Sequence, residues 1–495
     1  MLQTIDWHAR AKSVQLPNRP FIDGQYVDSV SNETFACVYP GDGRLLTQVA
    51  SCNEADVDRA VNSARKAFNA GVWSRMAPAD RRKILLRFSE LILANREELA
   101  LLETLNVGKP IANAFNGDVV SAANCIAWYA EAIDKVYGEV AATAHEMTTL
   151  VVREPLGVVA AVVPWNYPMS MAAWKLGPAL ATGNSVVLKP AEQSPFTALK
   201  FGELAIEAGL PAGVLNVVPG LGHIAGKALG LHMDVDCVGF TGSTEVGKYF
   251  MQYSGQSNIK RIGLELGGKS PQVVLADCDD LDAAAAGVAA GIFANTGQVC
   301  NAGSRLIVDE KVRDALFEKI AAHARSFTPG DPLDATTRMG SMVTEEQMDR
   351  VLGYIDAGRA EGATTLIGGS RVRVETGGFY IEPTIFDRVR NDMTIAREEI
   401  FGPVLSAITV KGFDEAMEVA NDTIYGLAGA VWTGSVKNAH RAAKAIKAGV
   451  VWVNCFDRGS MAVPFGGFKQ SGFGRDKSLH AMDKYTDLKA MWFAH

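Results

Sequence analysis

Hydrophobic and polar residues follow two different periods along the chain. In 53–70 and 77–104 the apolar residues recur every three or four positions, which predicts amphipathic helices. From residue 157 the pattern changes to short runs of consecutive apolar residues, among them GVVAAVVPW, NSVVLKP, DCVGFTG and PQVVLAD. Such runs are typical of strands that helices cover on both faces of a parallel sheet. This part of the chain therefore predicts a doubly wound α/β sheet.

A second set of apolar runs follows residue 300. RLIVD, LSAITV, LAGAVW and GVVWVN are separated by segments of helical periodicity around 311–327, 413–421 and 436–447. This alternation predicts a second α/β domain with its own sheet. The tail YTDLKAMWFAH predicts one more strand, with nothing after it to pair with, so we expect a sheet edge or a subunit contact there.

Turn and cap residues add two local expectations. Asp23-Gly24 in RPFIDGQYVDS supplies the positive φ angles of a tight hairpin near the N-terminus. Ser194 and Pro195 precede a helical pattern that Gly209 and Pro211 end, so we expect Ser194 to cap a helix there.

Composition and charge narrow the class of protein. The chain has 495 residues, of which 48% are hydrophobic and 21% charged, and its net charge is -7. These values are typical of a globular enzyme and do not provide the basic face that nucleic-acid binding needs. No run of apolar residues has the length of a membrane span, and no secretory signal pattern is present, so we expect a cytoplasmic protein without membrane association. Seven scattered cysteines without CxxC spacing predict neither a disulfide framework nor a metal site.

Glycine-containing turns raise the possibility of nucleotide binding. Gly242–Lys248 matches the GxxxxGK of a phosphate-binding loop, but Tyr249 follows where a magnesium-binding hydroxyl is needed, which disfavours an ATPase. The turns at 220–222 and 242–243 predict backbone donors for a pyrophosphate at helix starts. Glu192, soon after NSVVLKP, is either a ligand of ribose hydroxyls or a solvated surface acid. As a ligand it would repel a 2'-phosphate and favour NAD over NADP.

One cysteine lies in a setting that does not resemble a buried core thiol. Cys300, in NTGQVCNAGSR, has glycines, amides and small residues around it and no histidine nearby to take its proton. A lone free cysteine is more often structural, but the loop glycines let backbone amides face an open site. Asn166, between two prolines in VPWNYP, can donate to an oxyanion. Glu265 ends an apolar run before two glycines, where a carboxylate faces the ligand crevice.

Seven ordered blocks across nearly the whole chain resemble the NAD(P)-dependent aldehyde dehydrogenase superfamily. They are VVPWNYP, WKLGPALATGNSVVLKPAEQSP, FTGSTEVGK, LELGGKSP, GQVCNAGSR, EEIFGPV and PFGGFKQSGFGRD. The resemblance implies an aldehyde dehydrogenase-like α/β fold with a Rossmann-type cofactor domain, a second α/β catalytic domain and a small β oligomerisation element. The implied ranges are 1–132 with 156–264, then 265–468, and finally 133–155 with 469–495. It also implies a homo-oligomer, either a dimer or a tetramer.

The same resemblance implies a role for each matching residue. Cys300 is the implied nucleophile, Glu265 the general base, and Asn166 and the backbone amide of Cys300 the oxyanion donors. Lys175 and Asp476 are implied to assist proton movement behind Glu265, although many relatives have glutamate where this chain has Asp476. The residues implied to contact NAD are Trp165, Lys189, Glu192, Gly222, Phe240, Gly242, Ser243, Glu399 and Phe401.

The blocks WYAEAIDKVYGEV and GRDKSLHAMDKYT are most similar to gamma-glutamyl-gamma-aminobutyraldehyde and 4-guanidinobutyraldehyde dehydrogenases of polyamine and arginine catabolism. The residues implied to line the substrate tunnel are Asp118, Tyr167, Trp174, Asp457 and Phe465. Asp118 and Asp457 either meet a cationic substrate end or are solvated or paired acids. The small-molecule substrate can instead be a simple aliphatic aldehyde, or an anionic semialdehyde, for which Arg458 is the one entrance cation that the sequence offers. A non-catalytic relative of the fold is the remaining alternative.

Overall fold

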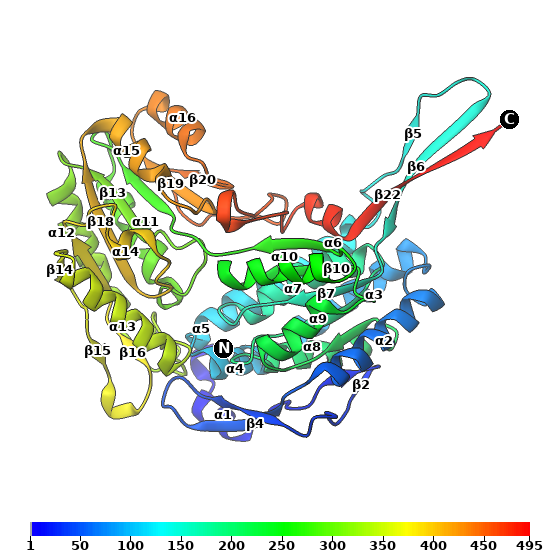
Figure 1. The fold of residues 1–495 in the computed structure, drawn as a ribbon. Helices are drawn as coiled ribbons and strands as arrows, with labels where there is room; N and C mark the ends of the chain where they lie inside the picture. The colour runs from blue at the N-terminus through cyan, green and yellow to red at the C-terminus, as the bar shows by residue number, and fades with distance from the viewer. Residues whose placement is uncertain (1) are drawn as a thin grey trace.

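The structure is a computed structural model and describes residues 2–495. Two large sheets form the body of the molecule, and a three-stranded sheet extends from it as an arm that carries the C-terminus (Figure 1). Two-stranded pairs complete the β-structure, β3 (Thr34–Val38) with β4 (Leu45–Ala50) and β15 (Arg371–Val372) with β16 (Tyr380–Ile381).

The first large sheet has eight strands in the order β2-β1-β9-β8-β7-β10-β11-β21. Its five central strands are parallel: β7 (Val158–Val162), β8 (Ser185–Lys189), β9 (Leu215–Val217), β10 (Cys237–Thr241) and β11 (Arg261–Glu265). The short strands β1 (Phe21–Ile22), β2 (Gln25–Tyr26) and β21 (Gly472–Phe473) add to its edges in antiparallel orientation. The chain runs outward from β7 in both directions, which makes the carboxyl end of β7 and β10 a ligand-binding crevice. The predicted hairpin and doubly wound sheet are confirmed.

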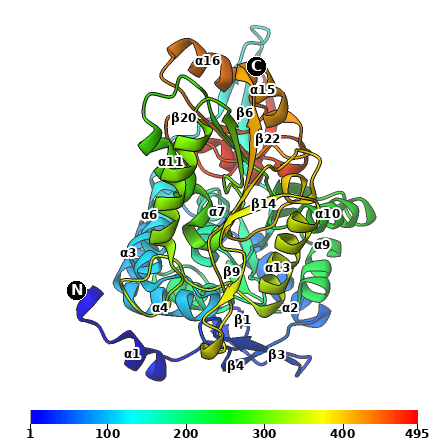
Figure 2. The same ribbon diagram turned by 90° about the vertical axis from the view of Figure 1, so that its left-hand side faces the viewer.

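Helices cover both faces of this sheet (Figures 1 and 2). In β7 the side chains alternate: Val158, Ala160 and Val162 lie in a core with α2 (Glu54–Ala70), while Val159 and Ala161 lie in another. That second core contains residues of α3 (Pro78–Ala94), α6 (Val119–Ala132), α7 (Pro168–Ala181) and α8 (Phe196–Glu207). The helices α9 (Lys227–Leu231) and α10 (Thr244–Gln256) lie on the side of α2. Burial on both faces explains why the strand is apolar at every position.

One expectation about a helix end was wrong. The predicted helical segment 77–104 forms two helices: α3 ends at Ala94, and α4 (Arg96–Val107) begins after Asn95, whose side-chain amide donates to Leu91 O at 2.8 Å. Ser194 does not cap α8, since its hydroxyl has no hydrogen-bond partner. The Asn106 side chain instead accepts the Phe196 N–H at 3.1 Å. A neighbouring helix therefore supplies the cap.

The second large sheet has seven strands in the order β14-β17-β18-β13-β12-β19-β20. The parallel strands are β12 (Pro271–Val274), β13 (Arg305–Asp309), β17 (Thr384–Asp387), β18 (Val404–Val410), β19 (Ala428–Trp432) and β20 (Val450–Val453), and β14 (Thr364–Ile367) pairs antiparallel at one edge. Its helices are α11 (Leu281–Phe293), α12 (Arg313–Ala324), α13 (Glu345–Ala360), α15 (Gly412–Asn421) and α16 (Val436–Ala445). The separate second sheet was predicted, but β14, β17 and α13 were not. The run PQVVLAD was expected in the first sheet, and this was wrong, because it forms β12 of the second.

The arm is a sheet of β5 (Glu139–Ala141), β6 (Met147–Pro155) and β22 (Thr486–Ala494). β22 pairs with β6 along its whole length and has no partner on its other side, so the predicted edge strand is confirmed. Residues 469–485 lie outside this sheet, because β21 pairs with β11 and η8 (Leu479–Tyr485) contacts α7. No helix in residues 2–495 combines the length and the apolar character that a membrane span requires.

Candidate active site

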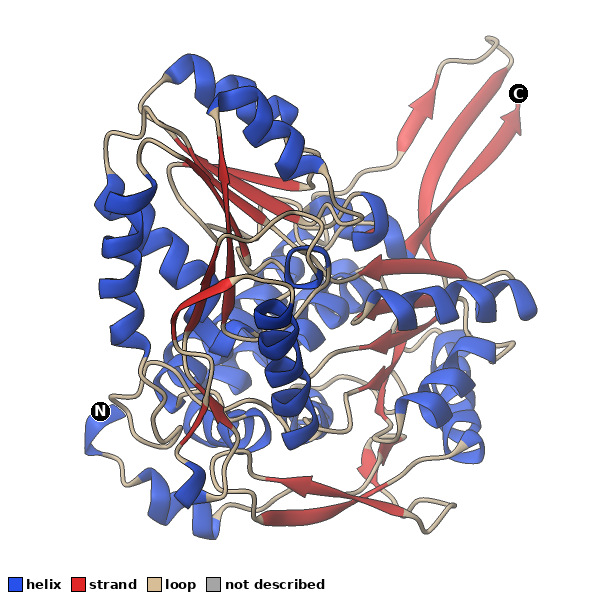
Figure 3. Cartoon of the chain, turned by 60° about the vertical axis from the view of Figure 1, so that its left-hand side comes forward, coloured by secondary structure: helices blue, strands red, loops and turns tan. Residues whose placement is uncertain are grey.

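A cavity of about 820 Å³ lies between the two large sheets. Figure 3 shows the two sheets on either side of the centre of the molecule. Residues 164–167 and 241–243 line it from the carboxyl ends of β7 and β10. Residues 299–301, Glu399 and Phe401 line it from the loops that precede β13 and β18. The cavity therefore joins the predicted crevice of the first sheet to loops of the second.

Cys300 lies in a sharply turned loop. Asn295, Thr296 and Gly297 have φ angles of 48°, 56° and 69°, and a Cβ on Gly297 would lie 2.1 Å from Gly402 O, so only glycine fits there. Burial raises the pKa of the Cys300 thiol to about 12, and the charges of nearby carboxylates add to this effect. The Asn301 backbone N–H opposes it by donating to the sulfur. The resting thiol is therefore protonated at neutral pH.

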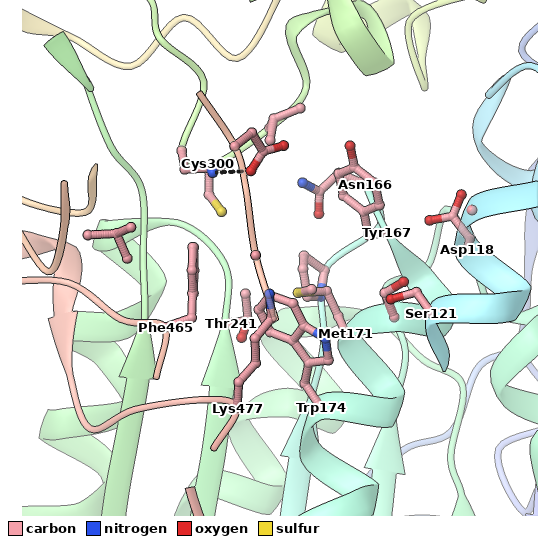
Figure 4. Close-up of a pocket in the computed structure, with 18 of the residues that line it drawn as sticks. Asp118, Ser121, Asn166, Tyr167, Met171, Trp174, Thr241, Cys300, Phe465 and Lys477 are labelled. Carbon is pink, nitrogen blue, oxygen red and sulfur yellow. Dashed lines mark hydrogen bonds between the residues drawn. The ribbon is translucent and has the colours of Figure 1, made fainter. Parts of the chain in front are cut away.

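Asn166 is tied to the cysteine loop by two hydrogen bonds. Its side-chain amide donates to Gln298 O at 2.9 Å, and the Asn295 amide donates to Asn166 O at 3.1 Å. An amide NH₂ has two donors, so one N–H of Asn166 remains. Figure 4 shows this amide directed toward the Cys300 side of the cavity. The Cys300 backbone N–H also has no acceptor within residues 2–495.

Glu265 is a buried carboxyl group at the end of β11. Neither of its side-chain oxygens has a hydrogen-bond partner among the described residues. Burial raises its pKa well above the usual range, and the negative charge of Asp476 raises it further. Glu265 does not line the cavity, but its charge is among those that raise the pKa of Cys300. Such an isolated acid is a strong proton acceptor once it is ionised.

Behind Glu265, Asp476 lies between two lysines. Its carboxylate is 2.5 Å from Lys175 Nζ and also contacts the ammonium of Lys484. Burial alone disfavours the Asp476 carboxylate, but the two lysines hold its pKa below the usual range. Burial lowers the pKa of Lys175, and Asp476 opposes that change. The group is a compact buried network that can hold and pass a proton.

The residues expected to contact NAD fall into two groups. Trp165, Gly242, Ser243, Glu399 and Phe401 line the cavity, whereas Lys189, Glu192, Gly222 and Phe240 do not. In the first group the centres of the Trp165 and Phe401 rings are 5.2 Å apart. The Glu399 side chain accepts the Gly268 N–H at 2.9 Å. In the second, Lys189 and Glu192 form an ion pair of 3.3 Å after β8.

The polar groups of this region fit a dinucleotide. Ser243 caps α10, so that helix presents its positive end beside the cavity, as pyrophosphate binding requires. The Thr241 hydroxyl is buried there without a partner. Glu399, whose pKa burial raises to about 7, uses only one oxygen and leaves the other for a ribose hydroxyl. No group of residues in 2–495 is arranged to hold a metal ion.

The five residues expected to line the substrate tunnel all lie in the cavity wall. Asp118 already has a partner: Lys109 Nζ lies 3.0 Å from its carboxylate, 3.3 Å from Glu103 and 3.8 Å from the centre of the Tyr167 ring. Asp457 accepts the Asn301 side-chain N–H at 2.8 Å. Of the two acids, only Asp457 is free of a cation within ion-pair distance.

Comparison with protein families decides the identity of the chain. Residues 26–491 match the aldehyde dehydrogenase family. The chain belongs to this family. The resemblance read from the seven sequence blocks is therefore confirmed.

Individual members of the family are similar to this aldehyde dehydrogenase over almost its whole length. The NADP/NAD-dependent aldehyde dehydrogenase PuuC of Escherichia coli is 49% identical over 99% of this chain and 98% of its own. The structure of indole-3-acetaldehyde dehydrogenase in complex with NAD⁺ has a TM-score of 0.98 and 57% identity, over 99% of both chains. That of gamma-glutamyl-gamma-aminobutyraldehyde dehydrogenase from Burkholderia cenocepacia has a TM-score of 0.97 and 57% identity, also over 99% of both.

Three lysines of this aldehyde dehydrogenase were missed by the sequence analysis. Lys109 and Lys484 are buried partners of Asp118 and Asp476. Nothing in the local sequence marks Lys109, whereas Lys484 lies in the block GRDKSLHAMDKYT. Lys477 lines the cavity, with its ammonium 4.4 Å from the centre of the Trp174 ring. Its position directly after Asp476, within the block GRDKSLHAMDKYT, was the available signal.

We expect Asp476→Ala to destabilise this aldehyde dehydrogenase by about 3–5 kcal/mol, because it leaves two buried ammonium groups without their carboxylate. Urea denaturation followed by circular dichroism measures the change. Asp476→Glu, which keeps the charge, is the matched control. Equal stability of the alanine variant and the native protein would contradict the buried network.

Proposed function

We propose that this protein oxidises an aldehyde to a carboxylic acid through a covalent intermediate on Cys300, with NAD as the hydride acceptor. The observation that carries the proposal is the convergence, on one cavity, of the Cys300 thiol and two free N–H donors, those of Asn166 and of Cys300 itself. Membership of the aldehyde dehydrogenase family supports the same reaction.

The Cys300 thiol first loses its proton to solvent water, and the resulting thiolate then attacks the aldehyde carbon. The carbonyl oxygen becomes an oxyanion, and the Asn166 amide and the Cys300 backbone N–H donate to it. Because Gln298 and Asn295 fix Asn166 by hydrogen bonds, the donors need no reorganisation during the step. No histidine is required.

NAD, when bound, supplies the hydride acceptor that oxidation of the Cys300 thiohemiacetal to a thioester requires. On this chain the start of α10 would hold its pyrophosphate, and Glu399 and Glu192 would hold its ribose hydroxyls. The Glu192 carboxylate repels a 2'-phosphate, which favours NAD over NADP.

Hydrolysis of the thioester completes the reaction. Glu265 takes a proton from the attacking water, and its raised pKa makes its ionised form a good base. Lys175 and Asp476 hydrogen-bond to each other behind Glu265 and carry the proton onward through bridging water, because no direct hydrogen bond joins them to Glu265. The carboxylic acid is then released.

The proposed substrate is an amino-, guanidino- or gamma-glutamylamino-butyraldehyde. The Burkholderia cenocepacia relative that is 57% identical carries a name from this group. The cavity offers aromatic side chains for an aliphatic chain, namely Tyr167, Trp174 and Phe465, and a free acid, Asp457, for an ammonium group. NADH formation with 4-aminobutanal, 4-guanidinobutanal and succinic semialdehyde tests the assignment. A higher rate with the anionic semialdehyde would contradict it.

We also infer a homo-oligomer that works in the cytoplasm. The unpaired edge strand β22 exposes Leu488, Trp492 and Phe493, a surface that a second copy of the chain can cover. All seven cysteines are free thiols, as in proteins of a reducing compartment. Sedimentation equilibrium distinguishes a monomer from a dimer or tetramer.

We expect Asn166→Ala to lower kcat by about 10²- to 10³-fold, the usual loss for one oxyanion donor. The thiol remains, so alkylation of Cys300 by iodoacetamide should be retained. Steady-state NADH formation measures the loss. An unchanged kcat would remove Asn166 from the reaction.

A further inference from the structure

The ammonium group of Lys477 occupies an unusual place for a surface-loop lysine. It lies 4.4 Å from the centre of the Trp174 ring and 5.5 Å from that of Phe465, whose rings are themselves 5.4 Å apart. Figure 4 shows the side chain extending between these two aromatic residues into the cavity. Within residues 2–495 the ammonium makes no ion pair or hydrogen bond. A positive charge therefore stands in the substrate wall with no anion bound to it.

The backbone on both sides of Lys477 is fixed. Asp476 and Phe465 exchange two backbone hydrogen bonds, of 2.7 and 2.8 Å, and the Ser478 N–H donates to Met461 O at 2.7 Å. Lys477 itself has a φ of 58°, a conformation that costs energy for a residue with a side chain. The tertiary structure holds this strained residue so that its side chain enters the cavity.

An acid on a second loop of the cavity wall, hydrogen-bonded to the neighbour of Cys300, accompanies Lys477. Asp457 also lines the cavity and also has a positive φ, of 54°. One of its oxygens accepts the Asn301 amide, and the other is open to a ligand. Lys477 and Asp457 act on each other electrostatically, but they are not within ion-pair distance of each other. The two opposite charges are separated and each is available.

We propose that Lys477 and Asp457 bind a zwitterionic α-amino-acid head at the far end of the aldehyde substrate. Lys477 takes the α-carboxylate, and Asp457 takes the α-ammonium. The inference rests on the proposed function and names the substrate class within it. A gamma-glutamyl aldehyde carries such a head, because its glutamyl α-amino and α-carboxyl groups are both free.

The charge inventory of this end of the cavity favours a zwitterion over simpler substrates. Asp118 is paired with Lys109, and burial raises the pKa of Glu103, the third member of this cluster, so the cluster leaves little attraction for a lone cation. Arg458 also lines the cavity, beside Asp457. Lys477 and Arg458 repel a monocation such as 4-aminobutanal, and Asp457 repels a monoanion such as succinic semialdehyde. Only a substrate group that carries both charges gives Lys477 an anionic partner and Asp457 a cationic one.

The test compares four aldehydes in Lys477→Met, Asp457→Asn and the native enzyme. These are gamma-glutamyl-gamma-aminobutyraldehyde, 4-aminobutanal, succinic semialdehyde and hexanal. We expect Lys477→Met to lower kcat/KM for the gamma-glutamyl substrate by about 10- to 100-fold, the range for losing one charge-assisted hydrogen bond. The same variant should raise kcat/KM for 4-aminobutanal and change that for hexanal less than that for either charged substrate.

Asp457→Asn should raise kcat/KM for succinic semialdehyde, in contrast to the gain for 4-aminobutanal in Lys477→Met. It should lower kcat/KM for the gamma-glutamyl substrate. Lys477→Arg, which keeps the cation, should retain the native preference. Lys437→Met, in an exposed lysine of α16 far from the cavity wall, is the matched control. Titration calorimetry of the product acid, gamma-glutamyl-gamma-aminobutyrate, against native protein and Lys477→Met gives a second measurement that does not depend on turnover.

Two results would overturn the proposal. The first is an equal loss for all four aldehydes in Lys477→Met, which indicates a general structural role. The second is product-acid binding that neither variant weakens. Hexanal separates this proposal from the proposed function: if hexanal is oxidised while the gamma-glutamyl aldehyde is not preferred, the zwitterion site fails and the dehydrogenase stands. If no aldehyde is oxidised, both fail.

Discussion

Cys300→Ala is expected to lower kcat for aldehyde oxidation by about 10⁴- to 10⁶-fold, the scale for removing the nucleophile of a covalent mechanism. No other cysteine of residues 2–495 lines the cavity, so no second thiol can replace it. Steady-state NADH formation measures the loss, and mass spectrometry of the protein after mixing with aldehyde tests for the missing acyl adduct. Retention of appreciable activity would show that the covalent step belongs to another group.

The pH dependence of the thiol provides a companion measurement. With its pKa raised to about 12 by burial, Cys300 is almost wholly protonated at neutral pH, and the thiolate fraction rises tenfold with each pH unit below that value. In the protein without cofactor, the rate of iodoacetamide alkylation at Cys300 should therefore keep rising from pH 7 to pH 10. A plateau near pH 8 would show that the structure stabilises the thiolate by itself.

Glu265→Gln is expected to release one equivalent of NADH per active site in a rapid burst and then to turn over about 10²- to 10⁴-fold more slowly, because deacylation loses its base. Acylation does not use Glu265, so the burst amplitude should remain. Stopped-flow absorbance measures both phases. Slow formation of NADH without a burst would place Glu265 in acylation instead.

The same residue should govern the pH profile of the native enzyme. A base must be ionised to accept a proton, and burial holds the pKa of Glu265 well above the usual range. Turnover limited by deacylation should therefore rise with pH as this carboxyl ionises, and Glu265→Gln should lose that rise. Persistence of the same rise in the variant would assign it to a different group.

Local pattern predicted much of the fold. The strand Val158–Val162 is apolar at every position because two separate cores cover it, and its sequence alone indicated a sheet buried on both faces. The hairpin at Asp23-Gly24 followed from the φ angles of its turn. The pattern did not predict the break between α3 and α4 at Asn95. It also did not predict the cap of α8, because Asn106, a side chain from another helix, accepts the first N–H of α8.

The candidate site also has features that the sequence predicted and features that only the tertiary structure shows. The sequence by itself determined which reactive groups exist and the loops that carry them: Cys300 in a glycine-containing turn, Asn166 after a strand, and Glu265 at a strand end. It did so because residue type and turn geometry are local properties. Only the tertiary structure decided their partners, since Lys175 meets Asp476 across 301 residues and Asn166 meets Gln298 across 132. The first contact depends on the return of the chain to the first sheet at β21, and the second on how the two sheets pack. Neither leaves a periodic trace in the chain.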